Sequence, residues 1–142
     1  MNFDGVLPSV QKGKCDFASC GITVTEERAE NVLFSSPIYH SGTVLVAHRD
    51  AVPEAAQTAS GVHWKDYNGK RIGVLTGPLM EDTAAECFPD SEKLIYNSYP
   101  DCITALLTGK IDAYLGDEPG LKSVHAEQPK IDYIHERITE NN

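Results

Sequence analysis

Two charged residues, Arg28 and Asp117, are suited by type and position to bind a small ligand. Arg28 follows a Thr-Glu-Glu sequence, which is typical of a helix that begins with a threonine N-cap. Its planar guanidinium can hold a carboxylate by two parallel charged hydrogen bonds, each worth roughly 1.5–3 kcal/mol. Simpler interpretations remain open. Arg28 could pair with a neighbouring glutamate on the helix surface, and Asp117, which precedes a Glu-Pro pair, could be an ordinary N-cap.

A repeated sequence places Asp117 at the end of a predicted strand. Gly-Lys-x-Asp occurs at residues 13–16 and again at 109–112. We interpret each copy as the joint between a helix and a buried parallel strand, with glycine in the φ > 0 turn and aspartate at the strand's entrance. Gly21 and Asp117 then mark the carboxyl ends of the two strands, where ligands bind in open α/β sheets. Alternatively, the repeat is a common helix-to-strand joint and its two copies are unrelated.

Alternating helical and strand patterns predict an α/β protein with parallel βαβ units. The expected helices cover residues 4–12, 80–87 and the segment between Ser98, an N-cap, and Gly109. The expected strands cover residues 16–20, 44–47, 71–75, 93–96 and 112–116. Gly13 is expected to cap the first helix in the left-handed conformation, and residues 51–61 to form a surface connection.

The composition of the 142 residues, 41% hydrophobic and 23% charged, predicts a soluble globular protein. Acidic residues outnumber Lys and Arg by 21 to 12 without a basic cluster, which argues against a nucleic-acid partner. No segment approaches the ~18 apolar residues of a membrane helix. The first ten residues lack the pattern of a signal peptide, so we expect any export signal to lie upstream.

The four cysteines, Cys15, Cys20, Cys87 and Cys102, contain no Cys-x-x-Cys pair, and the five histidines are scattered. We therefore expect neither a metal site nor a cofactor. Cys87 and Cys102 each lie on a predicted helix and could meet, although buried free thiols are the commoner state.

The segments CGITVTEER and AENVLFSSPIYHSGTVLVAH resemble the signature of the bacterial extracellular solute-binding proteins of family 3, the amino-acid-binding branch. The matching positions are Gly21, Thr23, Thr25, Arg28, Phe34, Ser35, Pro37 and Tyr39. WKDYNGKRIGVLTG and TALLTGKIDAYLGDEP resemble the opening and the later helix and strand of that family's second lobe. The resemblance covers nearly the whole chain. It implies the periplasmic binding protein-like II fold, in which two α/β lobes are joined by a hinge.

The resemblance also implies a ligand site to which both lobes contribute. Arg28 would bind the α-carboxylate of the ligand, with Thr23 as an auxiliary donor and with Gly21 allowing close approach of the backbone. Asp117, from the second lobe, would bind the α-ammonium.

The chain departs from the family at the start of the predicted helix in lobe two. There the family has Gly-Thr/Ser-Thr, whereas this chain has Gly77, Pro78 and Leu79. Pro78 has no N–H and Leu79 has no hydroxyl, so we expect a weakened second carboxylate contact and an atypical ligand.

Compared with the family, the chain lacks early and late segments of lobe one. We therefore expect residues 1–47 to form an incomplete lobe one and residues 48–142 to form lobe two. Uncovered apolar edges and faces of the incomplete lobe would favour self-association, by strand exchange or by docking.

The expected function is non-catalytic binding of an amino acid or similar small zwitterion that is passed to a membrane permease of the ABC type. The resemblance implies an extracytoplasmic location, either periplasmic or anchored at the cell surface. One alternative is the sensor module of a membrane receptor or kinase. A cyclohexadienyl dehydratase-like enzyme is a weaker alternative, because we assign no general acid and base to the cleft.

Overall fold

The computed structural model describes residues 5–51 and 62–141. Two compact units make up the chain: residues 1–40 with 141–142 form unit 1, and residues 41–140 form unit 2. This division lies between His40 and Ser41, whereas the sequence suggested one between residues 47 and 48. The difference arises because the strand that begins at Ser41 pairs along its length with a strand of unit 2.

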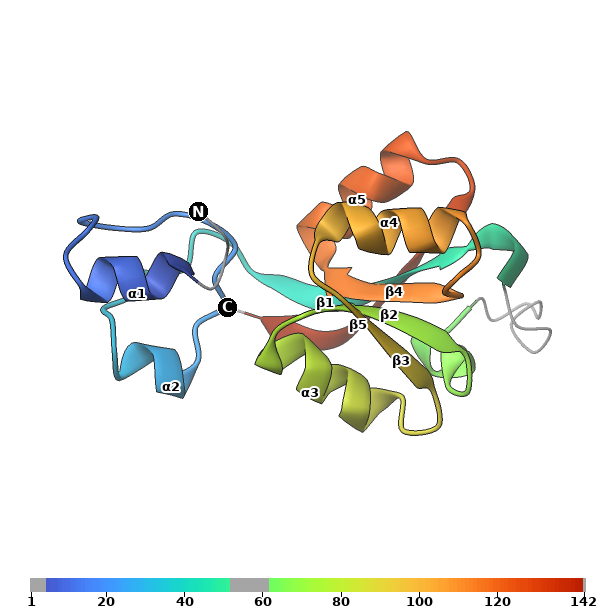
Figure 1. Cartoon of the computed structure of the whole chain (residues 1–142), viewed down its shortest axis with the longest axis horizontal. Helices are drawn as coiled ribbons and strands as arrows, with labels where there is room; N and C mark the ends of the chain where they lie inside the picture. The colour runs from blue at the N-terminus through green and yellow to red at the C-terminus, as the bar shows by residue number, and fades with distance from the viewer. Residues whose placement is uncertain (1–4, 52–61, 142) are drawn as a thin grey trace. The chain divides into compact units, whose positions relative to one another are not determined.

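Unit 2 is built on a five-stranded sheet with the order β3-β2-β4-β1-β5 (Figure 1). Its strands are β1 (Ser41–His48), β2 (Arg71–Leu75), β3 (Glu92–Tyr96), β4 (Ala113–Asp117) and β5 (Ile131–Asn141). β2 is parallel to both β3 and β4, whereas β1 is antiparallel to β4. Thr139 bonds to Thr43 and Asp132 to Arg49, so β5 runs antiparallel to β1.

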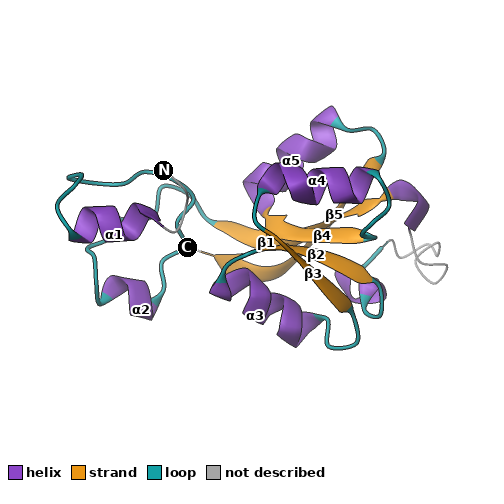
Figure 2. Cartoon of the chain, viewed as in Figure 1, coloured by secondary structure: helices purple, strands orange, loops and turns teal. Residues whose placement is uncertain are grey.

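Three helices cover the two faces of this sheet (Figure 2). They are α3 (Pro78–Cys87), α4 (Tyr99–Leu107) and α5 (Glu118–Glu127), and short 3₁₀ helices lie at Arg49–Ala51 and Trp64–Tyr67. α4 and α5 cover one face, and α3 covers the other (Figure 1). The order β2-α3-β3-α4-β4 gives the two parallel βαβ units that the sequence predicted. None of the helices in the described ranges is long and apolar enough to cross a bilayer.

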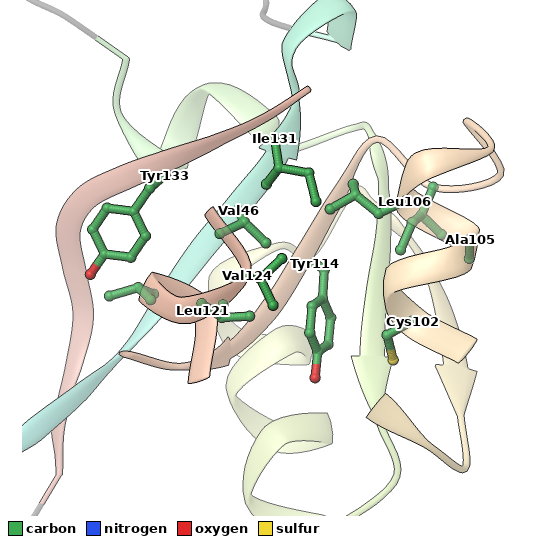
Figure 3. Packing of buried hydrophobic residues seen from close by; sticks show 11 residues of the cluster. Val46, Cys102, Ala105, Leu106, Tyr114, Leu121, Val124, Ile131 and Tyr133 are labelled. Carbon is green, nitrogen blue, oxygen red and sulfur yellow. The ribbon is translucent and has the colours of Figure 1, made fainter. Parts of the chain in front are cut away.

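Side chains that alternate along β1 contribute to two separate hydrophobic clusters. Val44 and Val46 belong to the cluster beneath α4 and α5 (Figure 3), whereas Leu45 and Ala47 face α3. All four are fully buried, which explains why this strand is a continuous apolar run. The first cluster also contains Cys102, Ala105, Leu106, Ile111, Tyr114, Leu121, Val124, Ile131 and Tyr133.

The expected elements of unit 2 are confirmed, with ends shifted by a few residues. Ser98 caps α4 by accepting a hydrogen bond from the Asp101 N–H at 3.3 Å, and Gly109 follows the helix at φ +69°. β5 and the 3₁₀ helix at Trp64–Tyr67 were not predicted from the sequence. The surface connection expected at 51–61 lies outside the described residues except for Ala51.

Unit 1 contains two short helices, α1 (Val6–Gln11) and α2 (Glu26–Ala29). Gly13 has φ +64° after α1, which confirms the expected turn. The strand expected at 16–20 is wrong. Residues 5–40 contain no strand, so the backbone groups of 16–20 have no neighbouring strand with which to pair. Within 5–40 only Ser9 is buried, so this stretch forms no apolar core of its own.

Candidate functional site

The candidate residues of unit 1 surround the start of α2. Thr25 has an extended backbone, and its Oγ1 accepts a hydrogen bond from the Arg28 N–H at 3.3 Å, so it is the N-cap that the sequence predicted. Glu26 and Glu27 follow in the first turn, where the helix dipole favours negative charge. This short helix therefore has a defined start, which fixes the position of Arg28.

The Arg28 side chain turns back toward the loop that precedes its own helix. Its Nη1 donates to the carbonyl oxygen of Thr23 at 2.9 Å, and the residue is half-buried. The structure thus brings together two of the predicted site residues, Thr23 and Arg28. The bond limits the rotamers of a long side chain, which lowers the entropy lost when the guanidinium binds a partner.

Gly21 leaves room for the ring of Tyr39. A Cβ at Gly21 would lie 3.3 Å from the Tyr39 hydroxyl oxygen, closer than most Cβ contacts in proteins. The glycine therefore has a packing reason within unit 1, in addition to the ligand approach that the sequence suggested. Gly21 and Tyr39 are both exposed, so they form part of the surface beside Thr23.

Asp117 is the last residue of β4 and precedes α5. Although it occupies the N-cap position, its side chain makes no capping hydrogen bond. Instead its Oδ1 accepts a hydrogen bond from the Ser41 hydroxyl at 2.9 Å, so the first residue of β1 orients this carboxylate. Burial raises the pKa of Asp117, and the bond from Ser41 opposes that shift. Asp117 therefore lies, as expected, at the carboxyl end of a parallel strand.

Gly77 and Leu79 lie at the start of α3, after the carboxyl end of β2. Gly77 is the N-cap with φ +148°, Pro78 is the first helical residue, and Leu79 is half-buried. Glu81, which the sequence analysis did not single out, folds back over this helix start. Its Oε1 accepts hydrogen bonds from the Gly77 N–H at 2.9 Å and from the Thr76 hydroxyl at 3.3 Å.

A buried acid next to Asp117 was also missed. Glu118 is only 8% exposed, and its carboxylate is bonded by Lys122 Nζ at 2.7 Å and by Arg137 Nε at 2.8 Å. The bond from Lys122 is the main cause that lowers the pKa of Glu118. The spacing of Glu118 and Lys122 could have indicated their pairing, but nothing local predicts a bond to Arg137 in β5. This network ties β5 to the start of α5, directly beside Asp117.

No metal centre or disulfide is found in the described parts of the chain. They contain no group of three or more His, Cys, Asp or Glu that could hold a metal ion. All four cysteines are free. Cys102 lies in the cluster under α4, whereas Cys87 packs against the cluster on the opposite face, so these two thiols do not meet.

Comparisons with known proteins agree with this architecture. Residues 1–57 match the family model of the bacterial extracellular solute-binding proteins, family 3. The chain is 28% identical over 138 residues to the ABC transporter arginine-binding protein 1 of Escherichia coli (strain K12), covering 97% of the chain and 53% of that protein. It is 31% identical over 130 residues to the probable histidine-binding protein of Campylobacter jejuni. This match covers 92% of the chain and 48% of that protein.

Solved structures show the same relationship. The arginine-bound form of truncated ArgBP from T. maritima superposes with a TM-score of 0.80 at 26% identity, covering 99% of this chain and 63% of that one. The substrate binding protein of an amino acid ABC transporter gives a TM-score of 0.80 at 27% identity. The superposition covers 100% of this chain and 61% of that one. The fold is therefore the periplasmic binding protein-like II fold.

The chain spans about half the length of the curated relatives that it matches. The family match covers residues 1–57, which include residues 1–40 of unit 1 and β1, and the whole-chain similarity extends through unit 2. Together these findings identify the chain as a part-length relative of the bacterial extracellular solute-binding proteins of family 3.

Proposed function

We propose that this chain contributes to an amino-acid-binding protein of an ABC-type importer, with unit 1 in lobe one and unit 2 as lobe two. The ligand would be an amino acid or a similar small zwitterion. Arginine and histidine are the first candidates, because several curated relatives are named for binding them. Gly21, Thr23 and Arg28 would supply contacts from unit 1, and Asp117 with the Gly77–Leu79 backbone would supply contacts from unit 2.

The observation that carries the proposal is the position of Arg28. Its side chain is held by the Thr23 carbonyl, and its backbone N–H bonds to the Thr25 cap, so the guanidinium is pre-positioned beside the loop that contains Gly21 and Thr23. A guanidinium held in this way suits the planar, bidentate recognition of a carboxylate. A zwitterion also needs an anion for its ammonium group. Asp117, which belongs to unit 2 and is oriented by Ser41, would supply it.

Binding without chemistry is part of the proposal. The curated relatives cited above are named as binding proteins, and none of the residues assigned to the site forms a general acid–base pair. An extracytoplasmic location and a membrane permease as partner are further parts of the proposal, and the same family relationship supports them. Turnover of prephenate or arogenate by the purified chain would contradict this part of the proposal.

Self-association is also proposed for unit 1, by strand exchange or docking with a second copy. Phe17, Leu33 and Ile38 are between 77% and 102% exposed, and residues 5–40 bury almost nothing that could shield them. Exposed apolar side chains of this size favour association. Light scattering that shows a compact monomer at micromolar concentration would refute it.

Calorimetry with the twenty amino acids tests the binding proposal directly. Arg28→Ala is expected to abolish binding, because the ligand carboxylate would lose its charged partner at a cost of about 2–5 kcal/mol. Arg49→Ala is the matched control, since Arg49 is exposed in unit 2 and pairs with Asp132. The proposal fails if no amino acid binds the chain, or if Arg28→Ala binds as well as the control.

A further inference from the structure

We propose that Asn68 is a site of covalent self-modification, by deamidation, which the fold keeps latent until the turn before β2 opens. Asn68 is followed by Gly69 in the one Asn-Gly pair of the sequence, and both residues are exposed. A glycine in second place favours deamidation, because it has no side chain to hinder attack by its backbone nitrogen. The inference does not depend on the proposed function, since the turn joins the 3₁₀ helix Trp64–Tyr67 to β2.

The reaction joins two neighbouring residues and releases ammonia. The backbone nitrogen of Gly69 attacks Cγ of Asn68, a new C–N bond forms, and the bond between Cγ and Nδ2 breaks. The nitrogen of Gly69 loses its proton and Nδ2 leaves as ammonia, so the product is a five-membered succinimide ring. Water then opens the ring at either of its carbonyls and leaves an aspartate or an isoaspartate. Nothing is oxidised or reduced, and water is the only co-reactant.

The closed turn holds the reacting atoms apart. Residues 67–70 form a type II turn, in which the Lys70 N–H donates to the Tyr67 carbonyl oxygen at 3.0 Å and Gly69 has φ +86°. Ring closure requires the Gly69 nitrogen to eclipse Cβ of Asn68 about the Cα–C bond. The ψ of +134° at Asn68 is far from that arrangement. The exposed pair therefore cannot react until the turn changes its backbone conformation.

Three hydrogen bonds to the loop that follows α3 fasten the turn. Asn68 Nδ2 donates to Asp90 Oδ2 at 2.8 Å, and Asn68 Oδ1 accepts the Asp90 N–H at 3.1 Å, so both ends of the reactive amide are held. The attacking group, the Gly69 N–H, donates to Ser91 Oγ at 3.0 Å. Ser91 is only 8% exposed, and its hydroxyl donates to the Tyr67 carbonyl oxygen at 3.3 Å. These bonds must break before the nitrogen can reach Cγ, so local opening limits the reaction.

Deamidation also removes the means of closing the turn again. The aspartate that forms has no N–H to donate to Asp90, and it places a second carboxylate beside that residue. Like charges at such a separation repel. The modified turn is therefore expected to open more easily than the original one.

Peptide mapping by mass spectrometry, after incubation of the folded chain at mildly alkaline pH, measures the reaction at Asn68. We expect Ser91→Ala to deamidate at least about tenfold faster than the wild type, because the Gly69 N–H loses its acceptor. Thr83→Ala is the matched control, since Thr83 is also 8% exposed and its hydroxyl donates to a backbone carbonyl oxygen, that of Leu79. If Ser91→Ala reacts no faster than the wild type or than Thr83→Ala, the inference is overturned.

A second measurement uses the wild type alone and does not depend on how well a variant folds. We expect Asn68 to react at least about tenfold faster in the urea-unfolded chain than in the folded chain, because unfolding removes the turn and its three bonds. Equal rates in the two states overturn the inference, and so does the absence of reaction at Asn68 in the unfolded chain. For the product, hydrogen exchange of the Gly69 amide should be faster in Asn68→Asp than in Asn68→Ala, which adds no charge. Equal exchange in these two variants refutes the effect assigned to the new carboxylate.

Discussion

Replacing Asp112 with asparagine should weaken the joint between β2 and β4. Asp112 is the aspartate of the second Gly-Lys-x-Asp sequence and directly precedes β4. Its carboxylate accepts three hydrogen bonds from Arg71, the first residue of β2: from the backbone N–H at 2.9 Å, from Nε at 3.0 Å and from Nη2 at 2.7 Å. The aspartate therefore ties together the amino ends of two parallel strands.

The size of the effect follows from these bonds and from their exposure. An asparagine keeps an acceptor for the backbone N–H of Arg71 but loses the charge that strengthens the two guanidinium bonds. The Asp112 side chain is 19% exposed, but that of Arg71 is 43% exposed, so solvent screens part of the interaction. We expect Asp112→Asn to lower the free energy of unfolding by about 1–2 kcal/mol at neutral pH.

The pH dependence provides a second signature. The hydrogen bond from Arg71 lowers the pKa of Asp112 below its usual value. A carboxyl group whose folded pKa is lowered adds stability above its unfolded pKa of about 3.9, and this stability is lost as the pH falls through the folded pKa. The difference between wild type and Asp112→Asn should therefore be constant above about pH 5 and shrink below about pH 4.

Urea unfolding followed by the fluorescence of Trp64 can measure this difference. Trp64 is the only tryptophan of the sequence. Its ring packs edge-on against that of Phe88, with the two ring centroids 5.6 Å apart, so its emission reports on the core of unit 2. Asp132→Asn is the control, because Asp132 pairs through one oxygen with Arg49, which is more exposed than Arg71. Loss of this ion pair should lower the free energy of unfolding by less than about 1 kcal/mol. Equal losses in the two variants, or a loss that persists unchanged at low pH, would refute the reasoning.

Two further substitutions and one chemical modification test the packing of unit 2. Gly73→Ala should destabilise the chain by about 1–3 kcal/mol, measured by the same unfolding assay, because its Cβ would overlap Ile111 Cδ1. Gly120→Ala in α5, whose Cβ would meet only a ring atom at 4.0 Å, should be neutral or stabilising by up to about 1 kcal/mol. Cys102 should resist iodoacetamide at pH 8, because burial raises its pKa to about 11, whereas the exposed Cys20 should react. Mass spectrometry of the labelled, folded chain would contradict this if Cys102 were modified as fast as Cys20.

Features that depend on neighbours in the sequence could be predicted without a structure. Thr25 and Ser98 as N-caps and Gly13 and Gly109 in left-handed turns are examples, as is the βαβ alternation of unit 2. Each of these caps or turns is determined by residues within about one helical turn, so local backbone chemistry specifies it. The bond between Glu81 and Gly77 also spans only four residues, but the prediction at Gly77–Leu79 concerned only the donors that this turn lacks.

The tertiary structure decided the features that depend on distant partners. The strand expected at 16–20 fails because a strand needs a neighbour, and its sequence pattern does not provide one. Asp117 bonds to Ser41, 76 residues away, rather than capping its own helix, and Glu118 is bonded by Arg137 from β5. Types and spacing of residues thus determined which side chains could do chemistry. Their partners were set by strand order and register, because only the packed sheet brings such separate segments within hydrogen-bonding distance.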